Sequence, residues 1–424
     1  MLRIVITAYG SLGDLLPYIG LGRALLARGH APVLAVAPSY ARLVAEAGLE
    51  SHPVRPDIEL DNAATVAKVM HPLRGQSFLV RRCILPHLRE TVADLDEVVR
   101  DADLLVSHPL SFAAPIVAAQ RRISWASTVL SPSGLFSQLD PSPVAAVPLA
   151  VTLLRRTPRA HRAIDFAMGM RTRHWARPIA ALRASFALPP GANPLRVGQF
   201  SPNLVLAMFS PVLAVAQADW PANTLVTGAV GYDTEGGRLP PGLRRFLDQG
   251  EPPIVFTLGS SATLASQALQ FYGASVDAAR RLGKRAVMLV GPSGFEPSGA
   301  PGDVAACHVE RFVSLAALFP HALAVVHHGG AGTLHHGLEA GRPALIVPFA
   351  FDQADHALRA ERMGIARVLF PAHYTATRVT DTVGSLLDDA ALAARAREVA
   401  ERVAEDRGPV AACIALEALA AGRG

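Results

Sequence analysis

The sequence predicts an α/β protein built from two doubly wound parallel sheets, and three observations support this. Short apolar runs alternate with amphipathic helical stretches in both halves of the chain, as repeated βαβ units require. Several of these runs are apolar throughout, which is typical of parallel strands buried on both faces. The chain has 424 residues, of which 50% are hydrophobic and 18% charged, so it can build two or three ordinary domains with a sizeable core.

Composition excludes several other classes of protein. A half-hydrophobic chain with few charges is not disordered. Cys83, Cys307 and Cys413 are scattered and match no disulfide or metal spacing, which suits a reducing compartment. The chain has no uncharged apolar run of the roughly 20 residues that span a bilayer. Met1 leads almost directly into an apolar run, so we expect no signal peptide and a cytoplasmic location.

The first 37 residues predict a βαβ unit. A strand is expected over Leu2–Ala8, a helix over Pro17–Arg28 and a second strand over Ala31–Ala37, with the loop Tyr9–Asp14 (YGSLGD) after the first strand. Dinucleotide-dependent oxidoreductases begin in this way, so that activity is an alternative function. It is disfavoured because the loop lacks the GxGxxG spacing and no acidic residue follows the second strand. Asp14 is also a candidate N-cap for the helix that follows it.

The rest of the first half continues the alternation. Because carboxyl ends of parallel strands meet at one edge of a sheet, the loops after the next two strands are expected to share a crevice with Asp14. These loops contain His108 and Ser131. The expected elements are strands at Leu104–Val106, Ile123–Leu130, Leu204–Phe209 and Thr224–Val230, a mostly helical insertion from about Val144 to Leu188, and a Gly- and Pro-rich linker at Gly231–Gly250.

The second half carries the most informative segment, His327–Gln353, which reads HHGGAGTLHHGLEAGRPALIVPFAFDQ. An apolar run, Ala322–Val326, predicts a buried strand, and the glycines after it allow a tight turn. Thr333 is placed to N-cap a helix over about Leu334–Ala340, which Gly341 ends. The free N–H groups and the dipole of a helix start favour a phosphate. A second strand, expected over Ala344–Val347, leads to the polar pair Asp352 and Gln353, whose side chains suit sugar hydroxyls.

Two simpler interpretations of this segment remain open. A Gly-rich turn between a strand and a helix is common in α/β proteins and alone indicates no particular ligand. Alternatively, His327, His328, His335 and His336 form a zinc site. Zinc is disfavoured because adjacent histidines at a strand end point to opposite faces, and neither a cysteine nor an HExxH pattern joins them.

The arrangement resembles the donor-binding motif of family 1 glycosyltransferases, which have the GT-B fold of two Rossmann-like domains facing across a cleft. The resemblance implies that His328, Gly330, Gly332 and Thr333 hold a nucleotide diphosphate. It also implies that Asp352 and Gln353 read the sugar. His336 departs from the family pattern, because plant-type members have a glutamate there for the ribose.

The resemblance assigns further residues. A loop after the expected strand Pro253–Leu258 also touches the diphosphate in the family, which implicates Ser260 and Ser261. The segment RFVSLAALFP resembles the family's base-stacking region, so Phe312 and Val313 are the candidate nucleobase contacts, with core packing as the alternative for Phe312. The loop GSLGD resembles the loop that carries the family's proposed catalytic base, which is Asp14 here. Ser11, His108 and Ser131 are the candidate acceptor contacts.

The resemblance implies an inverting, metal-independent transfer of a hexosyl or deoxyhexosyl group from a UDP- or dTDP-sugar to a hydroxyl, with no cofactor. Residues 1–235, joined by a C-terminal helix over about 406–424, are expected to bind the acceptor, and residues 236–405 the donor. A non-catalytic sugar-nucleotide binder is a further alternative, which would not need Asp14. Three markers resemble rhamnosyltransferases of rhamnolipid synthesis, with sterol glucosyltransferases close behind: the Asp-Trp-Pro segment at Trp220, the FLDQG run at Phe246–Gly250, and Asp355 two residues beyond Gln353. The resemblance implies a lipophilic acceptor such as a rhamnolipid-type lipid, a sterol or a polyketide.

The charge distribution suggests one more partner. The net charge of +5 comes almost wholly from arginine, and eight arginines fall between Arg155 and Arg183, after the apolar stretch Pro141–Leu154. The simple interpretation is a solvated helical face. The alternative is peripheral contact with anionic lipid at the inner face of the membrane. Nucleic acid is not expected, because this stretch has few aromatic residues and no recognition motif.

Overall fold

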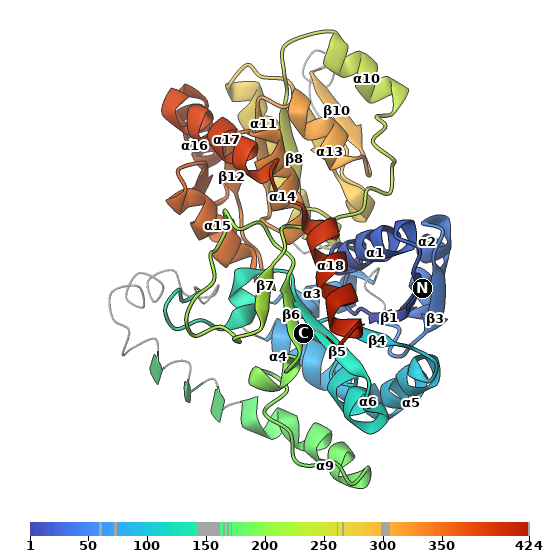
Figure 1. Cartoon of the computed structure of the whole chain (residues 1–424). Helices are drawn as coiled ribbons and strands as arrows, with labels where there is room; N and C mark the ends of the chain where they lie inside the picture. The colour runs from blue at the N-terminus through green and yellow to red at the C-terminus, as the bar shows by residue number, and fades with distance from the viewer. Residues whose placement is uncertain are drawn as a thin grey trace. The chain divides into compact units, whose positions relative to one another are not determined.

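The computed structural model divides the protein into two compact units, each built on one parallel sheet (Figure 1). Unit 1 contains residues 1–59, 73–232 and 406–424, and unit 2 contains residues 60–72 and 233–405. The prediction of two α/β domains with parallel sheets is therefore confirmed. The structure describes residues 1–58, 62–71, 74–142, 162–163, 166–167, 169–170, 172–260, 262–264, 267–297 and 306–422.

Unit 1 has a seven-stranded sheet in the order β3-β2-β1-β4-β5-β6-β7, and every neighbouring pair is parallel. The strand order reverses between β1 and β4, and ligands of open α/β sheets bind at such a switch point. The strands are β1 (Arg3–Thr7), β2 (Ala31–Val36), β3 (Glu50–Pro53), β4 (Leu104–Ser107), β5 (Ser124–Val129), β6 (Leu204–Ala207) and β7 (Thr224–Val226).

The unit 1 sheet is covered on both faces because its central strands are apolar throughout. Val5 of β1 packs in a core layer with α5 and α6, whereas Ile4 and Ile6 pack in the opposite layer with α1 and α18. The C-terminal helix α18 thus completes the core of unit 1, and Figure 1 shows it beside α1. The longer helices are α1 (Leu12–Ala27), α2 (Ala41–Glu46), α5 (Leu88–Val99), α6 (Ala114–Arg121), α9 (Arg177–Ser185) and α18 (Gly408–Ala420).

Shorter helical turns connect these elements. They are η1 (Pro38–Tyr40), α4 (Gly75–Phe78), η2 (Leu79–Ile84), η3 (Leu85–His87), η4 (Pro132–Leu135), η5 (Arg173–Ala176) and η6 (Val197–Gln199). The expected start of the first helix at Pro17 is wrong, because α1 begins at Leu12 and Pro17 lies inside it. About half of the expected insertion between Val144 and Leu188 lies outside the described residues.

Unit 2 has a six-stranded parallel sheet in the order β10-β9-β8-β11-β12-β13, with its switch point between β8 and β11. Ile254 and Phe256 of β8 pack on one face and Val255 on the other, so this sheet is also buried on both sides. The strands are β8 (Ile254–Thr257), β9 (Ala286–Leu289), β10 (Cys307–Glu310), β11 (Ala324–His327), β12 (Ala344–Ile346) and β13 (Ala366–Val368).

The helices of unit 2 include two features that the sequence did not predict. The short helix α3 lies early in the chain but packs in the unit 2 core through Val66 and Met70. Helix α10 lies within the segment Gly231–Gly250 that we expected to be a linker. The helices are α3 (Ala63–Val69), α10 (Pro241–Asp248), α11 (Ala268–Arg281), α13 (Leu315–Leu318), α14 (Ala331–Ala340), α15 (Gln353–Arg362), α16 (Ala376–Asp388) and α17 (Ala390–Val403), with turns η7 (Ala262–Leu264), η8 (Gly291–Ser293), η9 (Phe319–His321) and η10 (Pro371–His373).

Among the described residues, no helix is both long enough and apolar enough to cross a lipid bilayer.

Candidate functional site

The turn from β11 to α14 forms the centre of the candidate site in unit 2. His327 ends the strand, and Gly329 follows with a φ of +87°, a conformation that favours glycine. Gly330 has extended backbone angles and is the N-cap of α14. The prediction that Thr333 caps this helix is wrong, because α14 begins two residues before Thr333 and places that residue inside its first turn.

The N-terminus of α14 is open. No side chain caps it, so the N–H groups of its first turn have no intrahelical partner and the positive end of the helix dipole is exposed. Gly332 lies in this turn and is exposed, and a Cβ added there would have no atom within 4 Å. Nothing in the described protein therefore requires a glycine at position 332. An approaching anion would explain the small residue, since such helix starts bind phosphate groups.

The imidazole of His328 lies between two glycine backbones at this helix start. A Cβ built on Gly330 would be 2.4 Å from Nε2 of His328, and one built on Gly259 would be 2.5 Å from Cε1. Gly259 follows β8, and His328 follows β11, so this contact joins the two loops at the switch point of the sheet. Only glycine at both positions lets the loops close around the ring.

Burial controls the ionisation of His328. Desolvation first, and the neighbouring His356 second, lower its pKa to about 4, so the ring is neutral near pH 7. Its Nδ1 is buried without a hydrogen-bond partner among the described residues. Nε2 is the ring nitrogen beside the open start of α14, since a Cβ on Gly330 would almost touch it.

The other predicted diphosphate contacts lie near the same edge of the sheet. Ser260 is half-buried in the loop after β8, and its carbonyl oxygen accepts a hydrogen bond from Thr263 at 2.9 Å. Thr333 is only 7% exposed. Ser261 lies outside the described residues.

The loop from β12 to α15 holds the predicted sugar-reading pair. Asp352 is at the N-cap position of α15, and its side chain is 30% exposed. The Oε1 atom of Gln353 accepts hydrogen bonds from the N–H groups of Phe349 at 2.8 Å and Ala350 at 3.0 Å. The side-chain oxygen of Gln353 therefore binds the loop, and its amide nitrogen is not used in these two hydrogen bonds.

The predicted nucleobase contacts follow β10. Phe312 is 49% exposed, whereas Val313 is buried, so the alternative that Phe312 is a core residue is wrong. Ser314, the next residue, caps α13 and also bonds Asp233 at 2.5 Å, which fixes the loop at this end. The loop after β10 thus exposes the ring of Phe312, and the hydrogen bonds of Ser314 hold its backbone in place.

The two histidines of α14 share one carboxylate as their partner. Glu339 contacts Nε2 of His335 at 3.2 Å and Nδ1 of His336 at 2.9 Å. Although burial opposes it, hydrogen bonding to both imidazoles lowers the pKa of Glu339. Within the part of the chain that the structure describes, no group of three or more His, Cys, Asp or Glu residues is placed to hold a metal ion. The zinc interpretation of the four histidines therefore has no geometric support.

In unit 1, Asp14 lies in the first turn of α1. Its Oδ2 accepts hydrogen bonds from the backbone N–H of Ser11 at 2.8 Å and from the Ser11 hydroxyl at 2.9 Å, and the two residues form a capping box. Asp14 is therefore the third helical residue and not the N-cap. A Cβ on Gly10 would be 2.4 Å from Oδ2, so a glycine at position 10 is required for this geometry.

The other predicted acceptor contacts lie after β4 and β5. His108 is buried, and desolvation lowers its pKa to about 4 although the charge of Asp14 opposes that shift. Its Nδ1 accepts the N–H of Leu110 at 3.1 Å, so Nε2 carries the proton of the neutral ring. Ser131 is buried and its hydroxyl lies 2.9 Å from that of Ser133. Asp14 and His108 thus follow the two strands at the switch point of unit 1.

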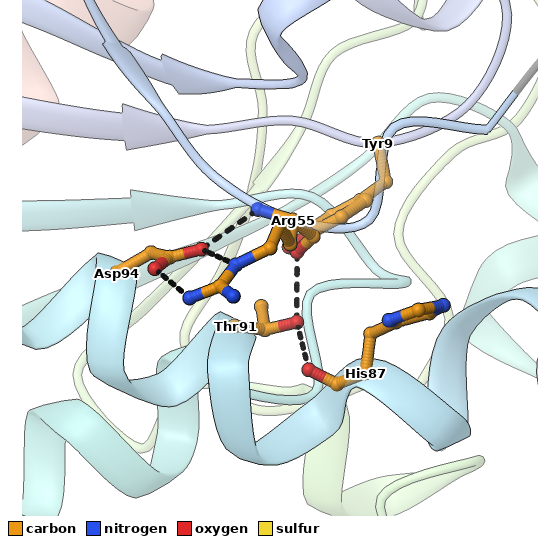
Figure 2. A network of polar contacts seen from close by, with 5 residues as sticks. All are labelled: Tyr9, Arg55, His87, Thr91 and Asp94. Carbon is orange, nitrogen blue, oxygen red and sulfur yellow. Dashed lines mark hydrogen bonds and ion pairs between the residues drawn. The ribbon is translucent and has the colours of Figure 1, made fainter.

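A polar network that the sequence did not reveal supports the Asp14 loop (Figure 2). The Tyr9 hydroxyl donates to the carbonyl of Arg55 at 2.7 Å. The Thr91 hydroxyl is 2.7 Å from the same carbonyl and 2.8 Å from that of His87. Arg55 binds Asp94 through its backbone N–H and its guanidinium, which lowers the pKa of that carboxyl. Tyr9 begins the short loop between β1 and α1, the helix whose first turn contains Asp14, so the network holds the start of that loop.

The structure therefore brings the predicted residues together in two separate groups. In unit 2, His328, Gly330, Gly332 and Thr333 share one turn with the Gly259 loop beside them. Sequence reasoning missed Gly259 as a partner of His328 and missed His356 altogether. The signal for His356 was its position three and four residues after Gln353 and Asp352, on the same face of one helix.

The sequence of this chain is similar to those of known proteins over nearly its whole length. Residues 298–419 match the family profile described as the C-terminal domain of erythromycin biosynthesis protein CIII-like proteins. The chain is 32% identical to O-mycaminosyltylonolide 6-deoxyallosyltransferase of Streptomyces fradiae, and the match covers 98% of this chain and 97% of that protein. It is 27% identical to vancomycin aglycone glucosyltransferase of Amycolatopsis orientalis, and the match covers 99% of this chain and 98% of that protein.

Solved structures agree on the fold. The glycotransferase of kitacinnamycin superposes with a TM-score of 0.73 at 22% identity and covers 99% of both chains. The glycosyltransferase VinC, solved in complex with dTDP, superposes with a TM-score of 0.69 at 20% identity and covers 100% of both chains.

Proposed function

This chain belongs to the family 1 glycosyltransferases of the GT-B type, and from that premise we propose that it transfers a hexosyl or deoxyhexosyl group from a dTDP-sugar to a hydroxyl of a natural-product acceptor. The observation that carries the proposal is the open start of α14 with the Nε2 atom of His328 beside it. The two relatives named above are glycosyltransferases, and each matches this chain over nearly its whole length. The oxidoreductase alternative is therefore not favoured.

The proposed donor site is in unit 2. The first-turn N–H groups of α14 and Nε2 of His328 suit a diphosphate, because backbone N–H groups donate hydrogen bonds and a neutral imidazole with its proton on Nε2 donates without taking up another. Phe312 and Val313 are proposed to hold the nucleobase, and Asp352 with the amide nitrogen of Gln353 the sugar. We favour thymine over uracil as the base, because VinC, with the same fold, binds dTDP.

The proposed reaction inverts the anomeric centre. Asp14 takes the proton of the acceptor hydroxyl, whose oxygen then forms a bond to the anomeric carbon while the bond to the diphosphate oxygen breaks. The negative charge that develops on the diphosphate is stabilised by the helix start and His328. In many phosphoryl-transfer enzymes a divalent cation neutralises such charge. Here the helix start and His328 are proposed to take that role, so the glycosyl transfer is proposed to be independent of metal.

The proposed acceptor is an amphiphilic natural product. The Streptomyces relative is by its name a transferase acting on O-mycaminosyltylonolide, and the Amycolatopsis relative acts on the vancomycin aglycone. These names favour a polyketide or peptide aglycone over the rhamnolipid or sterol suggested by the sequence markers. Contact with anionic membrane remains a separate proposal, because residues 143–154 of the apolar stretch and four of the eight arginines behind it lie outside the described residues.

Thermal-shift measurement with dTDP, UDP and NAD tests the donor class, because a ligand that binds only the folded state raises the Tm. We expect dTDP to raise it most and NAD not to raise it. Hydrolysis or transfer of the sugar from a dTDP-sugar, followed by release of dTDP, then distinguishes an enzyme from a non-catalytic binder. A shift with NAD alone would overturn the proposal.

A further inference from the structure

The backbone of one glycine in the donor loop, Gly329, contacts a buried histidine through each of the two peptide groups that flank it. The N–H of Gly329 donates to Nδ1 of His327 at 3.1 Å. The carbonyl of Gly329 lies 2.8 Å from Nδ1 of His356, which must therefore donate its proton to it. His327 and His356 are both fully buried.

The position of Gly329 leaves no room for adjustment. A Cβ built there would be 2.8 Å from Cγ2 of Ile346 and 3.1 Å from the carbonyl oxygen of Gln353. The loop after β11 is thus pressed against β12 and against the start of α15. Because Gly330 and the first turn of α14 follow directly, a shift of the Gly329 backbone would move the N–H groups at the start of α14.

The first turn of α15 holds two loops at once. Gln353 binds the backbone of the loop that precedes Asp352, as described above, and His356 binds the loop that precedes Gly330. The Nε2 atom of His356 lies 3.9 Å from Oδ2 of Asp352, which is too long for a hydrogen bond. Asp355, next to His356, forms a buried ion pair with Arg359 at 2.8 Å. Both residues belong to α15, so the pair stabilises the helix that carries both contacts.

We infer that His356 is a positioning residue for the donor: it holds the diphosphate-binding turn and, with Gln353, fixes that turn relative to the loop of Asp352. This inference rests on the proposed donor site in unit 2. If so, the side chain at position 356 must place a hydrogen-bond donor where Nδ1 of His356 lies. Asparagine can supply that donor, whereas glutamine reaches only to the place of Nε2 and leucine supplies no donor.

The test compares His356→Asn, His356→Gln and His356→Leu in the full chain, with Leu386→Ala as a control. Leu386 is fully buried in unit 2 and packs with Leu392 and Ala324, so its truncation destabilises the unit without touching α15. Calorimetry gives the Kd for dTDP and for thymidine, and steady-state kinetics give kcat and KM for a dTDP-sugar. All measurements are made well below the Tm of each variant.

We expect His356→Leu and His356→Gln to raise the Kd for dTDP roughly tenfold, the loss of about one hydrogen bond, and to leave thymidine binding unchanged. KM for the donor should rise with it. His356→Asn should bind dTDP within about threefold of wild type, and Leu386→Ala should bind both ligands normally.

Three results would overturn the inference. Equal losses for dTDP and thymidine would indicate general loosening of the unit. Loss in His356→Asn as large as in His356→Gln would remove the role of the Nδ1 donor. Unchanged dTDP binding in His356→Gln, combined with a loss in His328→Ala, would refute the role of His356 while the proposed function stands. If wild-type protein binds neither dTDP nor UDP, both the proposed function and this inference fall.

Discussion

The ring of His328 occupies the space that a side chain on Gly330 would need, since a Cβ there would be 2.4 Å from Nε2. The two residues are neighbours in one turn, yet the contact is made through the ring and not through the intervening backbone. Substitutions at Gly330 and Gly332 can therefore distinguish two effects. The first would produce a clash with the His328 ring, and the second would fill the space proposed for a ligand.

Gly330→Ala should lower both the Tm and the affinity for dTDP, because the new methyl group displaces the imidazole. Gly332→Ala should instead raise stability by about 0.4–1 kcal/mol, since an open helical position gains from losing a glycine, while it weakens dTDP binding by obstructing the phosphate. Thermal unfolding and calorimetry of both variants check this. Normal dTDP affinity in Gly332→Ala would place the diphosphate elsewhere.

Asp14→Asn should lower kcat by roughly 10²–10⁴ while dTDP binding stays normal, because a general base is lost and the donor unit is untouched. The asparagine oxygen can still accept the N–H of Ser11, so α1 should keep its cap. Asp57→Asn, an exposed acid of the same unit that bonds Ser39, is the matched control. Turnover in Asp14→Asn close to that of Asp57→Asn would contradict the assignment.

Stability should fall as the pH drops from about 6.5 toward 4. Burial lowers the pKa of His328 to about 4 and that of His327 to about 3, so the folded protein holds both rings neutral while the unfolded chain takes up protons near pH 6.5. The stabilising contribution of these neutral rings is complete above that value and is lost below it. A plot of Tm against pH measures the effect, and His328→Gln should make its slope shallower.

Binding of dTDP should take up protons near pH 6, because the diphosphate favours the charged form of His328 and raises its pKa. Calorimetry in two buffers with different enthalpies of ionisation counts the protons. His328→Gln should abolish most of this uptake. Uptake that persists in full would assign it to the phosphate or to another histidine.

Chelation should leave the activity unchanged, since the helix start and His328 are proposed to carry the charge of the leaving group. The assay is turnover of a dTDP-sugar before and after dialysis against EDTA, with added Mg²⁺, Mn²⁺ or Zn²⁺ as the comparison. Loss of activity on chelation and its recovery with one of these ions would contradict the proposed mechanism.

The protein should sediment with anionic liposomes at low salt and be released as salt rises, because surface attraction is screened beyond roughly 10 Å at 0.1 M. Arg162, Arg173 and Arg177 are exposed, and changing all three to Gln should weaken that binding. Changing Arg245, Arg378 and Arg402, exposed arginines of unit 2, is a control with the same loss of charge. If the two triple variants sediment alike, attraction is not specific to this segment.

The fold was more predictable than the details of the site. Apolar runs such as those that became β1 and β11 are a local signal, and so are the glycines that follow them. The starts of α1 and α14 were misplaced because several nearby residues can cap a helix, and tertiary packing chooses among them. The contacts of His328 with Gly259 and of His356 with Gly329 join segments far apart in the sequence, and no local pattern contains them.

Neither unit is a continuous stretch of the chain, and this restricts how hybrid enzymes can be made from it. Val66, in the early helix α3, is 1% exposed in the core of unit 2, and Cys413 and Leu416, in the last helix, are fully buried in the core of unit 1. In a chimaera joined once near residue 232, the core of unit 1 would pack against α18 of the other parent, and the core of unit 2 against α3 of the other parent. A functional exchange of donor specificity should therefore transfer residues 60–72 together with 233–405, and keep residues 406–424 with the recipient.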